Sequence, residues 1–219
     1  MAREYCRDAC GIMQSSMKSE ERWTKWSRPE QANYFLELKP FMVASVLLIV
    51  AGAIFGIVSS ISSPEIAGAR SEAIKEFSRL FLGLSKPYLA LAIFLNNALK
   101  TLAVIVLGIF AGLLPLVFLL VNGYVLGLVL HASLQSKGLS VFFLAVAPHG
   151  LFELPAILLG TSIGLMLGAR VLSHFFGKRE GSLGNDLARG LRFFVTVIVP
   201  MLLLAALIEA FVTSALASK

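Results

Sequence analysis

The chain alternates long apolar runs with short polar segments. Five of the runs reach about twenty residues or more, the length that an α-helix needs to cross the hydrocarbon core of a bilayer. They predict five membrane spans, with six as the alternative, at about residues 41–61, 87–112, 113–135, 140–170 and 193–212. The expected fold class is therefore all-α, a polytopic transmembrane helical bundle.

The run at residues 140–170 is longer than one span requires, so we expect this helix to be tilted or broken. Pro148 and Gly150 mark the natural point for a break, because proline removes a backbone donor and glycine relaxes the backbone. A hairpin is expected at residues 136–138. The division between two spans near Gly112 has the weakest turn signal.

Two polar segments flank the first span. In residues 1–40, basic residues surround Trp23 and Trp26, a pattern typical of a segment that lies along the membrane surface. Residues 62–86 open on Ser-Ser-Pro-Glu, a helix start signal, and continue as an amphipathic helix expected outside the cell. The predicted domains are a cytoplasmic or interfacial segment, residues 1–40, and a transmembrane helical domain, residues 41–213.

Composition supports the membrane assignment. Of the 219 residues, 57% are hydrophobic and 15% are charged, and the mean hydropathy is +0.82. A soluble globular chain is nearer to half apolar and a quarter charged. A soluble enzyme, a disulfide-stapled secreted domain and a disordered tail are excluded. Cys6 and Cys10 lack further ligands nearby and are expected to be reduced thiols.

Charge indicates the orientation. Lys and Arg number 19 against 13 Asp and Glu, a net charge of +6. The basic residues gather beside apolar runs, where they set topology and meet anionic lipid, and no segment has the pattern of a nucleic-acid groove. We expect no nucleic-acid partner. The Lys/Arg excess predicts that the N-terminus and residues 171–192 face the cytoplasm of a multi-pass cell-membrane protein.

Polar residues inside the predicted spans are costly and require a role. Counted at ~1.5 Å per residue, members from three spans reach a common level, ~14–20 Å from the outer surface. The midplane polar cluster so defined comprises Asn96, Asn97, Lys100, Asn122, His149 and Glu153. Pairing of Lys100 with Glu153 is one expectation, and structural hydrogen bonds between helices are the other.

His149 and Glu153 lie four residues apart, so one helix face would present two ligands to a metal ion. A zinc site needs a third ligand, with Asn122, His131 or a second copy of the chain as sources. Zinc is therefore a candidate cofactor. The Gly-Thr-Ser-Ile-Gly sequence at 160–164 matches the nucleophile-elbow pattern but lies in an apolar helix, where it predicts packing.

Glycines recur every four residues in several spans. This spacing removes side-chain bulk from one helix face and lets another helix approach closely. The glycines expected at helix contacts are Gly52, Gly56, Gly108, Gly112, Gly123, Gly127, Gly160, Gly164 and Gly168.

Three elements resemble the stage II sporulation protein M family. They are Phe94-Leu95-Asn96-Asn97, Asn122-Gly123, and Pro148-His149-Gly150-Leu151-Phe152-Glu153 with the glycines that follow. The resemblance covers about residues 89–170 and implies an integral membrane protein. It also implies partner proteins, because the namesake is a membrane component of a peptidoglycan-degrading complex that remodels the forming spore's envelope. Relatives also occur in organisms that form no spores. The resemblance therefore implies the fold more strongly than it implies the task.

The function expected from the sequence is a non-enzymatic membrane scaffold or complex component. Its expected partners are membrane lipid, a second copy of the chain in a homodimer, and other membrane or envelope proteins. Two alternatives stay open: a channel or transporter with a pathway past the midplane polar cluster, and an intramembrane metal-dependent enzyme that uses His149 and Glu153. Five spans without a visible repeat are few for a transporter.

Overall fold

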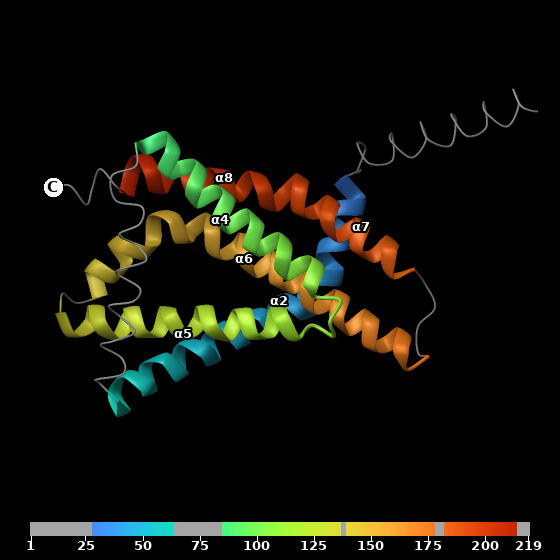
Figure 1. The fold of residues 1–219 in the computed structure, drawn as a ribbon, viewed down its shortest axis with the longest axis horizontal. Coiled ribbons are helices and arrows are strands. Elements are labelled where there is room, and N and C mark those ends of the chain that lie inside the picture. Colours follow the sequence, from blue (N-terminus) through green and yellow to red (C-terminus); the bar gives the residue numbers. More distant parts are fainter. Residues whose placement is uncertain (1–27, 64–84, 137–138, 178–181, 214–219) are drawn as a thin grey trace, which may run out of the picture. The chain divides into compact units, whose positions relative to one another are not determined.

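The computed structural model describes residues 28–63, 85–136, 139–177 and 182–213, with side chains for most of them. All elements in these residues are helical (Figure 1). They are α2 (Arg28–Ser62), α4 (Lys86–Leu107), α5 (Leu113–Ser136), α6 (Leu139–Phe175), α7 (Leu183–Phe193), η1 (Phe194–Ile198), α8 (Val199–Ile208) and η2 (Glu209–Thr213). The predicted interfacial segment around Trp23 and the amphipathic helix after the first span lie outside the described residues.

Five helical stretches in the described residues are long and apolar enough to cross a membrane. They are Pro29–Ser62, Lys86–Leu107, Leu113–Gln135, Gly150–Phe175 and Leu183–Phe211. The prediction of an all-α, five-span bundle is confirmed, and the chain is a multi-pass membrane protein.

The helical stretches that contain the first, fourth and fifth predicted spans are longer than those spans, whereas α4 ends five residues before the end of the second one. α2 begins at Arg28 and passes through Pro40, and α7 adds the residues from Leu183 onward to the last span. α6 continues through Pro148 as one helix, so it is not broken there. The ribbon of α6 instead changes direction before its long straight section (Figure 1).

The chain divides into two compact units, residues 1–37 and 38–219. The described part of the first unit is the beginning of α2. The second unit contains the rest of α2 and all the other described helices. Its core lies along α6, because 56% of the residues in the most apolar part of Gly150–Phe175 are buried.

A tight turn at residues 108–112 joins α4 to α5. Ala111 and Gly112 have φ angles of +54° and +73°, in the left-handed region that side chains with a Cβ rarely adopt. The amide of Gly112 donates to the carbonyl of Gly108 over 2.9 Å, which closes the turn. The division expected near Gly112 is therefore a compact reversal rather than a loop.

Pro200 accounts for the π-helical segment η1 in the last span. A proline has no N–H, and its ring collides with the carbonyl four residues earlier, here that of Thr196. Widening of the helix over Phe194–Ile198 relieves this collision. The Thr196 hydroxyl also donates to the carbonyl of Arg192 over 2.8 Å, so both this hydroxyl and this carbonyl have a hydrogen-bond partner.

Candidate functional site

α2 and α5 touch backbone to backbone at four glycines. A Cβ atom built on Gly52, Gly56, Gly123 or Gly127 would come within 3.0 Å of a carbonyl oxygen of the opposite helix, closer than real Cβ atoms approach. Glycine is therefore the residue that this contact requires. The two glycine pairs lie opposite each other in increasing order, so α2 and α5 run in the same direction.

α6 makes a second contact of this kind with α4 and the turn after it. A Cβ on Gly160 would press into the Thr101 side chain, and one on Gly168 would strike the backbone of the 108–112 turn. A Cβ on Gly164 would lie 2.7 Å from the carbonyl oxygen of Val104. The order of these contacts makes α4 and α6 parallel, as alternating crossings by successive spans require.

Hydroxyl groups join the spans between these contacts. The hydroxyls of Ser45 on α2 and Ser162 on α6 lie 3.1 Å apart, and both residues are fully buried. Ser59 on α2 lies 3.1 Å from the hydroxyl of Tyr124 on α5. The Ser162 hydroxyl also lies 2.5 Å from the carbonyl oxygen of Leu158. The serine of the nucleophile-elbow pattern thus sits inside a helix and bonds to a neighbouring span.

Two neighbouring members of the midplane polar cluster bond to each other. The amide of Asn96 donates to the side-chain oxygen of Asn97 over 3.1 Å. The amide of Asn122 donates to the carbonyl of Phe118 in its own helix over 2.7 Å. These three asparagines and Glu153 are half-buried, whereas Lys100 is exposed on α4.

Pairing of Lys100 with Glu153 stays a prediction. Gly160 lies beside Thr101, so Glu153 lies two turns, or about 10 Å, toward the start of both helices. A bond between the two charges requires the Lys100 side chain to extend in that direction.

A metal site at His149 and Glu153 also stays a prediction. Both residues belong to α6 and are four apart, so they share one helix face. The side chain of His149 lies outside the described residues. Among the residues that are described, no three His, Cys, Asp or Glu side chains are grouped to hold a metal ion.

Sequence reasoning missed an ion pair between α6 and α7. Arg170 Nη1 lies 2.5 Å from Asp186 Oδ1, and the two side chains are only 14% and 7% exposed. Asp186 lies in the first turn of α7, where a carboxylate is favoured by the helix dipole. The sequence did contain a signal for this pair. Arg170 is the last residue of the predicted span 140–170, and Asp186 lies in the polar segment that follows it.

The chain is similar to known proteins over most of its length. Residues 45–214 match the family model described as Stage II sporulation protein M. An uncharacterized protein of Methanocaldococcus jannaschii is 26% identical over 126 residues, 57% of this chain and 71% of its own. A second uncharacterized protein of that organism is 30% identical over 95 residues, 43% of this chain and 41% of its own.

No solved structure matches the chain. The matched region begins inside α2 and contains the glycine contacts, the midplane polar cluster and the Arg170–Asp186 pair. Because the family model covers well over half of the sequence, the chain belongs to the stage II sporulation protein M family.

Proposed function

We propose that the protein is a non-enzymatic scaffold of the cell membrane, a homodimer that holds other membrane or envelope proteins. The observation that supports this proposal is the backbone-to-backbone packing of α2 on α5 and of α4 on α6. Helices whose backbones are in direct contact form a rigid bundle, and a rigid bundle presents fixed outer surfaces to partner proteins. The role of the family's namesake within a membrane complex supports the same conclusion.

The outer surface of α2 is available for such contacts. Leu47, Ile54 and Ile61 recur on one side of the helix with exposed fractions of 64%, 56% and 64%. In a bilayer this side of α2 faces lipid or another protein. Contact with another protein is what a scaffold requires.

Subunit counting and flux measurements test the scaffold proposal together. Purified protein in lipid nanodiscs is expected to contain two copies per disc. The same protein in liposomes is expected to carry no proton or potassium flux above that of protein-free liposomes. A single copy per disc would contradict the homodimer, and a flux that Glu153→Gln abolishes would contradict the scaffold.

A transport pathway is the second candidate, and a specific arrangement favours it. Asn96, Asn97 and Glu153 are half-buried on α4 and α6, two parallel helices in contact. Polar groups on facing helices at membrane depth are typical of solute pathways. The Glu153→Gln flux comparison separates this candidate from the scaffold.

The proposed orientation places the N-terminus and the α6–α7 connection in the cytoplasm. Ser85 and Ser182 are exposed residues that precede α4 and α7. With Cys6 and Cys10 replaced by Ser, a membrane-impermeant thiol reagent is expected to label Ser85→Cys on intact cells. Labelling of Ser182→Cys is expected only after permeabilisation. The reverse pattern would overturn the orientation.

A further inference from the structure

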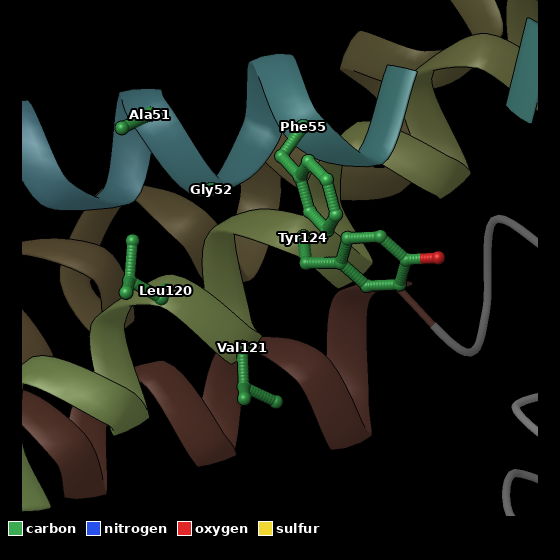
Figure 2. Close-up of a pocket in the computed structure, with 6 residues that line it drawn as sticks. All are labelled: Ala51, Gly52, Phe55, Leu120, Val121 and Tyr124. Carbon is green, nitrogen blue, oxygen red and sulfur yellow. The ribbon is translucent and has the colours of Figure 1, made fainter. Parts of the chain in front are cut away.

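An apolar groove of about 450 Å³ lies between α2 and α5. It is lined by Ala51, Gly52, Phe55, Leu120, Val121 and Tyr124 (Figure 2). Both helices are long and apolar enough to span a membrane, and the groove lies well inside each of them. Its walls are open to the surroundings, since Phe55 is 66% and Val121 is 54% exposed. The groove therefore opens toward the hydrocarbon of the bilayer.

The groove cannot be closed by a closer approach of its two helices. Gly52 and Gly123 already bring α2 and α5 into backbone contact beneath it. Gly52 has no side chain and Ala51 has only a methyl group with which to fill the space next to them (Figure 2). An apolar space that stays empty forfeits dispersion contacts along its walls. The described residues leave this space open, so a molecule of the surrounding bilayer can occupy it.

We propose that the groove binds one acyl chain of a membrane phospholipid. Its volume lies within the range of sites that hold small ligands, and its lining is mostly carbon. Phospholipid chains are the abundant apolar molecules at this depth, and an extended chain fits a groove between two helices that run side by side. This inference does not depend on the scaffold proposal.

An aromatic pair marks where the bound acyl chain ends. The rings of Phe55 and Tyr124 lie 5.6 Å apart between centroids, tilted by 43°. They stand on the side of the groove toward the C-terminus of α2, and the Tyr124 hydroxyl points away from the groove on that side (Figure 2). The bound chain enters from the side where α2 begins, and its terminal methyl lies against the rings.

A groove-filling variant tests the proposal against a matched control. Val121→Trp puts a large side chain into the groove, whereas Val195→Trp puts the same side chain on η1 of the last span, at a position that is 62% exposed and outside the lining. The probe is a phosphatidylcholine that carries a diazirine near the end of one chain, reconstituted with the protein and photolysed. Mass spectrometry maps the cross-linked residues.

We expect adducts concentrated on the groove residues of the unaltered protein and of Val195→Trp. In Val121→Trp these adducts are expected to fall at least fivefold. Ala51→Leu, which narrows the groove from α2, is expected to act in the same direction, so the test does not rest on one variant. Equal labelling of the groove in Val121→Trp and Val195→Trp, labelling spread evenly over exposed residues, or a groove without adducts in the unaltered protein would each overturn the proposal.

Discussion

Gly168→Ala is expected to lower the free energy of unfolding by about 2–3 kcal/mol. The added Cβ would fall within 3.0 Å of the backbone of Ala111 and Gly112. Those atoms belong to a turn that already has two left-handed residues and cannot yield cheaply. Either α6 moves away from the turn or the turn loosens, and both outcomes cost packing. Thermal unfolding in a mild detergent, followed by the loss of helical circular dichroism, measures the change.

Gly184→Ala is the matched control for this substitution. Gly184 is an exposed residue of α7, and the nearest atom to an added Cβ is the Ser182 hydroxyl at 3.5 Å. Alanine favours a helix over glycine by up to about 1 kcal/mol, so this variant is expected to be neutral or slightly stabilised. If both variants shifted the unfolding transition equally, the close approach at Gly168 would not be what holds the turn on α6.

Hydropathy was sufficient to predict the number of spans. A run of apolar residues must form a helix in lipid because backbone donors and acceptors have no other partner there. Polar or turn residues follow the apolar run that leads into Ser62 and precede the one that begins at Leu113. α2 ends at Ser62 and α5 begins at Leu113, so these two limits agree with the hydropathy. Where a helix continues into polar sequence, as α2 does upstream of Phe41, hydropathy predicts only its buried part.

Glycine spacing predicts that a helix face can be approached, but it carries no information on which helix approaches. Gly52 and Gly123 lie in different spans, and nothing local to either indicates that they meet. That pairing depends on how all the spans pack at once. Estimated depth along the membrane is similarly incomplete as a guide to contacts, because Asn122 is expected at the level of the midplane polar cluster, yet its amide donates to the carbonyl of Phe118 in its own helix.

The helical stretch that contains the last predicted span begins about ten residues before that span. Charges between Val171 and Arg192 favoured a hydrophilic loop when each was counted alone, yet α6 continues to Phe175 and α7 begins at Leu183. Pairing with Arg170 lowers the cost of placing Asp186 in a buried helical turn. The distance between these two residues depends on the fold of the intervening chain, which their sequence positions do not reveal.

Asp186→Leu and Arg170→Met are each expected to lower the free energy of unfolding by about 3 kcal/mol. Each substitution removes one member of a buried ion pair and leaves the other charge without that partner, a change that typically costs about 3–5 kcal/mol. We take the lower end because Arg170 keeps 14% of its side chain exposed. The double variant replaces both charges by apolar groups and is expected to recover most of the loss. Unfolding of all three variants under the same detergent conditions gives the coupling energy directly.

Asn185→Ala supplies the control, because Asn185 lies in the same turn of α7 and is exposed. It is expected to change stability by less than about 0.5 kcal/mol. Additive losses in the double variant would show that Arg170 and Asp186 stabilise the bundle through separate neighbours. A large coupling energy would instead show that this one contact joins the end of α6 to the start of the last span. Because the pair is shielded from solvent, its coupling energy is expected to change little between low and high salt.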